Sequence, residues 1–478
     1  MGNRLTSCAV NVSVRKTFRL AANGKAAPNG TANGINGRSA MDESTPLLPG
    51  AAVDESNAHL SVRDLFFNKR YAPGANSPNP LVRFPARSWN IFKVTLLSSW
   101  INLLLVFVPL GIVAGIQEWG ATWVFTLNFF AIIPLAAVLS FATEEIAHRL
   151  GETLGGLVNA TFGNAVELIV SVVALRAGEI EVVQASMLGS ILSNLLLVLG
   201  MCFFLGGIYN MRDADGNAQE QSFATGTAQT TCSLMALASA SMIIPAALYG
   251  VLDQAEDDHK ASSILFLSRG TSVILLSLYC LYLFFALHTH KKLFEPEAAV
   301  ENGASSEEPE PPLLGPWSAA LVLILVTLVI SVCADHMVAS IDDLVATGKI
   351  SKNFIGLILI PIVGNAAEHV TACVVAVKNK MDLAMGVAIG SSIQIALLVT
   401  PALVMLGWAI GQPMTLHFET FETIAFALSV MVVTYTVQDG KSNYLEGAML
   451  LGLYIIIAVA FWASPGKALD KVLTLVNP

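Results

Sequence analysis

The sequence predicts an all-α integral membrane protein with about eleven transmembrane helices, arranged as two inverted five-helix repeats plus one extra N-terminal helix. Three observations predict this fold class. Of the 478 residues, 54% are hydrophobic and only 13% are charged, whereas soluble domains carry about 25% charged residues. Long apolar runs follow one another from residue 91 onward. One short signature also occurs twice, each time inside such a run.

Residues 1–90 are expected to form a disordered cytosolic tail, because Gly, Ala, Asn, Ser and Pro dominate and no apolar period is sustained. Within it, the hexamer from Glu43 to Leu48 resembles an acidic dileucine signal that sorting adaptors bind. A chance match in plain linker sequence is an open alternative. The bilayer is the other expected partner.

Eleven apolar runs have the length needed to cross the hydrocarbon core, which takes about 20 residues. The first run has no counterpart and is expected to be an added N-terminal span. Residues 120–287 form the first predicted repeat and residues 317–463 the second. An acidic, proline-rich linker at 288–316 separates them, and 464–478 form a C-terminal tail. The predicted helices are 91–116, 120–142, 153–177, 182–208, 222–251, 263–287, 317–346, 353–377, 383–410, 419–437 and 443–463.

The halves are related by a fixed interval. Residues 163–167 are Gly-Asn-Ala-Val-Glu and residues 364–368 are Gly-Asn-Ala-Ala-Glu, so Glu167 precedes Glu368 by 201 positions. The pair Gly-Ser at 189–190 recurs at 390–391 with the same interval, which indicates an internal repeat. Equivalent positions are five helices apart. Because five is odd, the second copy enters the membrane from the opposite side, which is the architecture of many secondary transporters.

Each signature places a carboxylate inside an apolar helix. A charge at the centre of a spanning helix costs roughly 2.5–3.5 kcal/mol on insertion scales, which favours a functional role. Asn164 shares a helix face with Glu167, as Asn365 does with Glu368, and the glycines before them allow close approach or a local break. The following helices add a second oxygen-bearing face. The candidate metal ligands are Gly163, Asn164, Glu167, Ser190, Ser193, Asn194, Gly364, Asn365, Glu368, Ser391 and Gln394.

These ligands are carboxylate, amide, hydroxyl and backbone oxygens, which suit Ca2+ and less readily Mg2+ or Mn2+. His369 is expected to be a structural residue, because it has no symmetric counterpart. Glu144 and Asp335 are candidates for a proton or access path. Glu144 closes the second apolar run, and Asp335 lies inside the seventh.

Two adjacent carboxylates in an apolar environment disfavour the doubly ionised state, whereas a divalent cation stabilises it. The site therefore holds either two protons or one metal ion. Both forms are close to neutral, so both are expected to reorient through the bilayer, and obligatory exchange follows.

Composition and motifs weigh against other functions. The formal net charge of −9 argues against nucleic acid as a partner. The six cysteines show no CxxC spacing and are expected to be buried packing residues. No HExxH motif supports an intramembrane metalloprotease, and no cofactor is expected. A channel stays open as an alternative, although paired halves around one central site favour a carrier.

The two signatures resemble the paired repeat of calcium/proton antiporters, the CAX family of the cation/Ca2+ exchanger superfamily, in its fungal vacuolar type. Residues 189–194 and 390–394 are similar to the segments that follow in that family. The resemblance covers roughly residues 90–463. It implies a secondary active antiporter, not an enzyme, that loads Ca2+ into an acidic vacuole in exchange for H+.

The same resemblance implies that Glu167 and Glu368 bind Ca2+ and protons in turn, with the other candidate ligands lining the site. Asp335 stands where relatives often carry Glu. A Mn2+-preferring or broad divalent cation/H+ exchanger is the alternative, since Mn2+ accepts the same oxygens. Basic residues such as Arg83, Arg87 and Lys93 near the first span place the N-terminus on the cytosolic side.

Overall fold

The computed structural model describes residues 66–69, 73–75, 77–213, 215–252, 257–290, 312–346 and 350–463, all of which belong to one compact unit, Leu60–Pro478. The sorting hexamer, most of the tail at 1–90, most of the linker at 288–316 and the tail at 464–478 lie outside the described residues.

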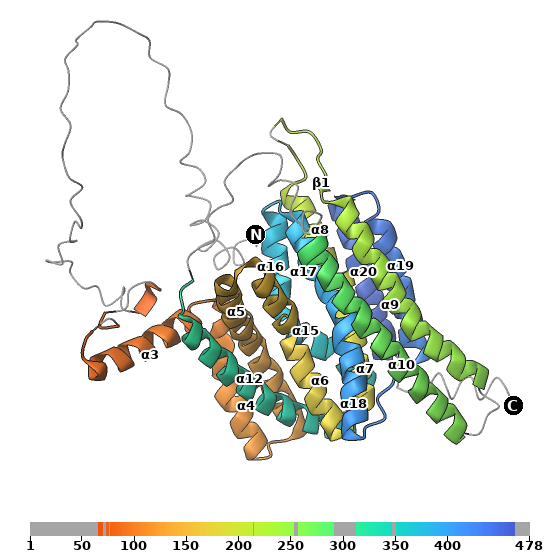
Figure 1. Ribbon diagram of the computed structural model, residues 1–478, viewed down its shortest axis with the longest axis horizontal. Helices are drawn as coiled ribbons and strands as arrows, with labels where there is room; N and C mark the ends of the chain where they lie inside the picture. Colours follow the sequence, from red (N-terminus) through yellow and green to blue (C-terminus); the bar gives the residue numbers. More distant parts are fainter. Residues whose placement is uncertain are drawn as a thin grey trace, which may run out of the picture. The chain divides into compact units, whose positions relative to one another are not determined.

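The described residues are almost entirely helical (Figure 1). Two short strands, β1 (Gln221–Ser222) and β2 (Lys441–Ser442), pair antiparallel with Gln221 opposite Ser442. The helices in the first half are α3 (Pro80–Leu96), the 3-10 helix η1 (Trp100–Val106), α4 (Phe107–Ile116), α5 (Ala121–Phe162), α6 (Ala165–Ala177), α7 (Ile180–Leu192), the π-helix η2 (Ser193–Val198), α8 (Leu199–Tyr209), α9 (Thr225–Val251), α10 (Asp257–Phe284) and the π-helix η4 (Phe285–Thr289).

The second half is also formed mainly by helices (Figure 1). Its helices are α12 (Pro316–Ala339), α13 (Ile341–Ala346), α14 (Lys352–Phe354), the π-helix η6 (Ile355–Leu359), α15 (Ile360–Gly364), α16 (Ala366–Val377), α17 (Met381–Gln394), the π-helix η7 (Ile395–Val399), α18 (Thr400–Ile410), α19 (Thr420–Thr436) and α20 (Tyr444–Ala463).

Among the described residues, seven helices are long and apolar enough to cross a membrane, or up to nine if each of two bent pairs forms one span. The predicted all-α membrane fold is therefore confirmed, but the count of eleven is not. Two predicted spans account for the difference. Thr420–Thr436 is a shorter apolar helix, and residues 153–177 form the end of α5 and all of α6, interrupted at the first signature.

The predicted first span at 91–116 differs from the structure. Residues 91–96 belong to α3, which begins at Pro80 inside the predicted tail, and the chain then bends by 109° before Trp100–Ile116. The physical reason is local. Ser99 caps the next helix by accepting a hydrogen bond from the Ile101 N–H, and the Asn102 side chain donates to the Thr95 carbonyl across the bend.

The predicted break at 143–152 also differs, because α5 continues through this polar stretch. Glu145 and Arg149 of this stretch bond to the chain that leads into α12. The Glu145 carboxylate accepts from the N–H groups of Leu313 and Leu314 at 3.1 and 2.7 Å, and Arg149 donates to the Leu314 carbonyl. The buried carboxylate of this stretch, Glu145, is therefore satisfied by protein groups, whereas Glu144, His148 and Arg149 are exposed.

The internal repeat extends to the helix bounds. α6 begins at Ala165 and α16 at Ala366, 201 positions later. The same interval relates the first residues of α7 and α17, and both ends of α8 and α18. A π-helical segment joins α7 to α8 and α17 to α18 at nearly matching places, Ser193–Val198 and Ile395–Val399.

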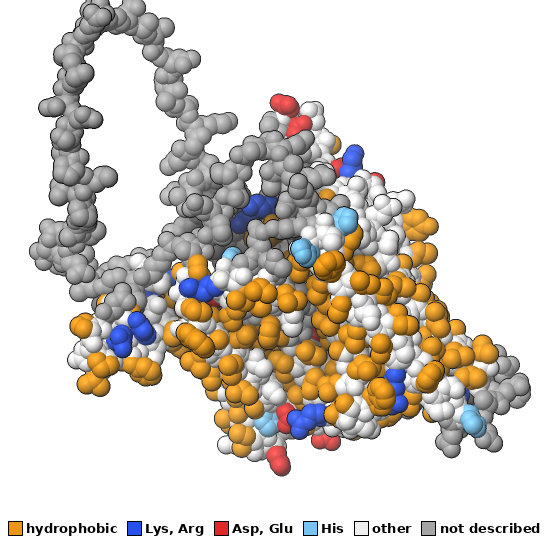
Figure 2. Space-filling model, in the orientation of Figure 1, with side chains coloured by type: hydrophobic (Ala, Val, Ile, Leu, Met, Phe, Trp, Pro, Cys, Tyr) orange, Lys and Arg blue, Asp and Glu red, His pale blue; other side chains and the backbone are white. Residues whose placement is uncertain are grey.

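Helices of the two halves pack through small residues. A Cβ on Gly200 of α8 would lie 3.1 Å from Leu450 of α20, and Gly447 of α20 lies against the Phe204 backbone. Small residues allow this close approach in membrane proteins. Outside the core, hydrophobic side chains cover the middle of the helical bundle and charged ones gather toward its two ends (Figure 2).

Candidate functional site

Both signatures form helix breaks. α5 ends at Phe162, and α6 begins at Ala165 after Gly163 and Asn164. In the second half α15 ends at Gly364, Asn365 precedes α16, and the chain bends by 57°. Each break places a glutamate in the first turn of a new helix, where free N–H groups and the helix dipole favour negative charge.

Gly364 provides space for Glu167. A Cβ at Gly364 would lie 2.7 Å from Glu167 Oε1, which is closer than carbon and oxygen atoms approach without a bond. Gly163 is similarly crowded, because a Cβ there would lie 2.8 Å from the Asn159 carbonyl oxygen. Gly364 thus allows the close approach of Glu167, whereas the neighbour of Gly163 belongs to the preceding turn of its own helix. Each helix break falls at the asparagine of the signature.

A polar network joins the two halves at these breaks. Asn164 Nδ2 donates to Gln394 Oε1 at 2.6 Å, and Ser391 Oγ lies 2.6 Å from Asn164 Oδ1. Ser391 Oγ also lies 3.1 Å from Glu368 Oε2. Since a serine hydroxyl has one hydrogen, it donates to only one of these acceptors at a time. The first signature is thus in direct contact with the second-half site residues.

The remaining predicted ligands surround this network. The Glu368 carboxyl lies within electrostatic reach of Glu167. Asn194 is fully buried, and neither polar atom of its side chain has a hydrogen-bond partner among the described residues. Ser193 Oγ lies 3.3 Å from His369 Nε2, so His369 contacts the first-half face. Ser190 is buried on α7. Asn365 is fully buried, and neither polar atom of its side chain has a hydrogen-bond partner among the described residues.

A cavity of about 500 Å³ leads to this network from one end of the bundle. Its lining includes Glu368, Ser391 and Gln394, and toward the helix ends Glu144 and Asp382. Glu167 is not on this lining. It borders a separate small void between apolar side chains. The two signature carboxylates therefore have different access to the outside.

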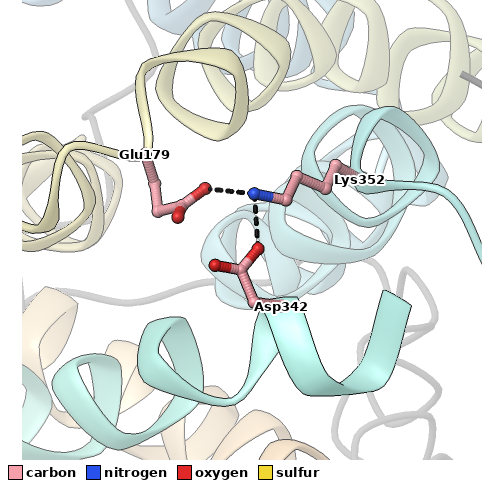
Figure 3. Close-up of polar contacts among 3 residues, drawn as sticks. All are labelled: Glu179, Asp342 and Lys352. Carbon is pink, nitrogen blue, oxygen red and sulfur yellow. Dashed lines mark hydrogen bonds and ion pairs between the residues drawn. The ribbon is translucent and has the colours of Figure 1, made fainter. Parts of the chain in front are cut away.

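Polar contacts join segments of the chain at the opposite end of the bundle. The long helix Ile180–Tyr209 runs from one end of the bundle to the other. Glu179 directly precedes its first residue, and the cavity residue Ala224 follows its last residue, so Glu179 and the cavity lie at opposite ends. At the Glu179 end, Lys352 Nζ lies 2.9 Å from Glu179 Oε2 and 2.5 Å from Asp342 Oδ1 (Figure 3). These three residues, the Lys352 cluster, connect the chain after α6 with the chain before α15.

Further hydrogen bonds lie at the same end. Asn353 donates to Glu419 Oε2 at 2.7 Å, and Gln184 donates to the carbonyl oxygens of Thr415 and His417, each at 2.9 Å. None of these residues belongs to the predicted site. Their types are common at solvated helix ends, so the sequence carried no signal for this contact set.

The two predicted access-path acids lie in different surroundings. Glu144 is exposed and lines the cavity, whereas Asp335 is exposed on α12 and is not part of the cavity lining. The sequence did not indicate Asp382, Tyr279 and Tyr282, which also line the cavity. Asp382 holds the start of α9 by accepting from the Ala224 N–H at 2.7 Å.

The chain matches known proteins over most of its described length. A family model, sodium/calcium exchanger protein, matches residues 120–288 and 318–463. A vacuolar calcium ion transporter of Schizosaccharomyces pombe is 51% identical over 374 residues, which is 78% of this chain and 87% of that protein. A Ca(2+)/H(+) antiporter of Synechocystis is 43% identical over 374 residues, 76% of this chain and 97% of that protein.

Solved structures agree with these matches. Native YfkE superposes with a TM-score of 0.62 at 33% identity, covering 76% of this chain and all of that one. A crystal structure of an H+/Ca2+ exchanger, CAX, has a TM-score of 0.55 at 12% identity over 76% of this chain and 90% of that one, which supports the fold alone. The resemblance found in the sequence is confirmed, and the chain belongs to the sodium/calcium exchanger protein family.

Proposed function

We propose that this protein is a secondary active antiporter that exchanges Ca2+ for H+ by alternating access. One observation carries the proposal, namely the junction at which Asn164 of the first signature bonds Gln394 and Ser391, next to Glu368 of the second. A polar network that joins the two halves inside an apolar bundle fits a binding site for a transported ion. It fits less well a set of hydrogen bonds that only hold neighbouring helices together. Relatives named as calcium transporters and Ca(2+)/H(+) antiporters support the same substrates.

The chemistry of the junction suits Ca2+. Its groups are two carboxylates with amide and hydroxyl oxygens, and Ca2+ takes 6–8 oxygen ligands in flexible geometry. The buried, unpartnered Oδ1 of Asn365 is a further available oxygen. Asn164, Ser391 and Gln394 would turn from one another toward the ion, and the neighbouring Ser190, Ser193 and Asn194 would complete the first-half face.

Protons and Ca2+ compete for the same two carboxylates. With both Glu167 and Glu368 protonated the site is neutral, and with Ca2+ bound the two negative charges are balanced. An empty, doubly ionised site would carry two uncompensated charges through an apolar bundle, which costs several kcal/mol per charge. The protein therefore changes its access only when loaded, and transport in one direction is coupled to transport in the other.

Access to the site would alternate between the two ends of the bundle. In this conformation the cavity gives access to Glu368 from one end, while the Lys352 cluster closes the other end. Residues 120–287 and 317–463 act as inverted repeats on either side of the site, and 288–316 links them. Movement of one repeat against the other would close the cavity and separate Lys352 from its partners.

Location and orientation complete the proposal. The protein lies in the membrane of a vacuole or similar acidic organelle, as the names of relatives suggest, with its N-terminus in the cytosol. The cavity end then faces the cytosol, because it lies at the end of α10 that leads into the linker. Glu144 attracts cations at this cavity, and Asp335 serves a proton path from α12.

The test is uptake of radiolabelled Ca2+ into acid-loaded proteoliposomes. Glu167→Gln and Glu368→Gln are each expected to lower the rate by at least about a hundredfold, because each removes one of only two charges that balance Ca2+. Glu220→Gln is the matched control, since this exposed carboxylate lies outside the cavity and contacts Lys441 and Asn443 at the surface. Normal proton-driven uptake by either signature variant would refute the role of that glutamate.

A further inference from the structure

α3 projects from the helical bundle instead of running along it (Figure 1). The chain bends by 109° between α3 and Trp100–Ile116, so if the second helix crosses the membrane, α3 runs close to the membrane plane. Among the described residues, the buried contacts between α3 and the bundle lie at its C-terminal end. Val94 is fully buried against Leu314 and Ala319, with Ile91 packed beside them. The remaining length projects outward (Figure 1).

The exposed part of α3 has two chemically distinct faces. Leu81, Phe84 and Phe92 are 83, 77 and 56% exposed, and their spacing places them on one side of the helix. Arg83 and Arg87 project from the other side and are also exposed. Figure 2 shows hydrophobic side chains along one edge of this projecting helix and basic ones along the other.

The charge of α3 is of one sign. Its 17 residues contain two arginines and one lysine, and no aspartate or glutamate. Basic residues on the polar face and Phe, Trp and Leu on the other are typical of helices that lie in a membrane interface. The apolar face also continues a lipid-facing surface, because Leu103 and Ile116 of the following span are 81 and 70% exposed.

We propose that α3 lies in the bilayer interface beside the first span, with Leu81, Phe84 and Phe92 inserted among the acyl chains and Arg83 and Arg87 at anionic phospholipid headgroups. Insertion gives the exposed aromatic rings an apolar environment. It also favours the helix despite Pro85, which removes one backbone hydrogen bond. Because Val94 contacts the start of α12, the interface helix fixes the first span and α12 at the same membrane surface.

The experiment uses the full-length protein in proteoliposomes that contain phosphatidylcholine or phosphatidylserine with a photoreactive acyl chain. Crosslinked peptides are identified by mass spectrometry. Wild-type protein is expected to crosslink at Leu81, Phe84 and Phe92 but not at Arg83. The double variant Phe84→Gln/Phe92→Gln is expected to lose crosslinking in this peptide by about tenfold, since its apolar face is interrupted.

Arg83→Gln is the matched control for that variant, because it makes the same kind of change on the opposite face. It is expected to retain acyl-chain crosslinks, whereas Arg83→Gln/Arg87→Gln is expected to abolish a preference for phosphatidylserine over phosphatidylcholine. Absence of lipid crosslinks in the wild-type peptide would overturn the proposal. So would crosslinks from this face to the chain's own N-terminal segment or to another protein, because either would show a protein occupant.

Discussion

Glu144 and Glu145 are neighbours on α5, but their carboxylates lie in different surroundings. Glu144 is exposed to the cavity, and Glu145 is 6% exposed with both oxygens bonded to backbone N–H groups. The sequence places both just after the apolar run at 120–142. It could not separate them, because the partners of Glu145 lie 168 and 169 positions away.

The pair predicts opposite phenotypes. Glu145→Gln loses a charge-assisted bond to Leu313 or Leu314 and is expected to cost about 1–3 kcal/mol of stability, with a lower thermal unfolding temperature in detergent. Transport per folded molecule should be retained. Glu144→Gln is expected to unfold at the wild-type temperature and to raise the KM for Ca2+. Equal stability of the two variants would contradict the structural role of Glu145.

Gly364 gives a second prediction at this scale. Ala at this position would place a methyl group 2.7 Å from Glu167 Oε1 and displace the carboxylate. Displacement of a reacting group by about 1 Å can cost up to about a hundredfold in rate, so a loss of ten- to a hundredfold in Ca2+ uptake is expected. Gly452→Ala is the matched control, because no atom lies within 4 Å of its added Cβ. An unimpaired Gly364→Ala variant would show that Glu167 does not need this position.

At the scale of helices, the apolar runs predicted most spans closely. The prediction at 222–251 corresponds to Thr225–Val251, and that at 443–463 to Tyr444–Ala463. The hydropathy pattern gave the wrong helix ends at two places. α5 continues through a polar stretch because distant backbone groups satisfy its side chains, and the run at 91–116 contains the bend after α3. Neither the bonds of Glu145 nor the bond of Asn102 across the bend leaves a periodic signal in the sequence.

The Lys352 cluster yields the prediction for elements. Lys352→Met removes both ion pairs and leaves Glu179 and Asp342 without their cation, so the closed end should open more often. Backbone hydrogen exchange at residues 350–355 and 412–418 is expected to increase. Lys441→Met is the control, because its partner Glu220 lies 3.5 Å away at an exposed position. Unchanged exchange in Lys352→Met would show that the cluster does not hold this end closed.

For the whole molecule, the interval of 201 residues was the strongest sequence signal. It predicted two related halves, and the structure brings Asn164 of the first half into contact with Gln394 and Ser391 of the second. The interval could not predict asymmetry between the halves. Glu368 lines the cavity while Glu167 borders a separate void. A repeat in the sequence carries no information on which of its two glutamates borders the cavity.

Obligatory exchange is the prediction that tests the molecule as a whole. Since the empty site would carry two uncompensated carboxylates, Ca2+ movement down its own gradient should stop when no proton or second Ca2+ returns. Proteoliposomes buffered at high pH on both sides, with no internal Ca2+, are expected to take up little radiolabelled Ca2+. Unlabelled Ca2+ inside should restore uptake of the label by exchange, even without a pH difference. Rapid net uptake into Ca2+-free vesicles at high pH would mean that the unloaded carrier reorients freely, and the two glutamates would then not couple the ions.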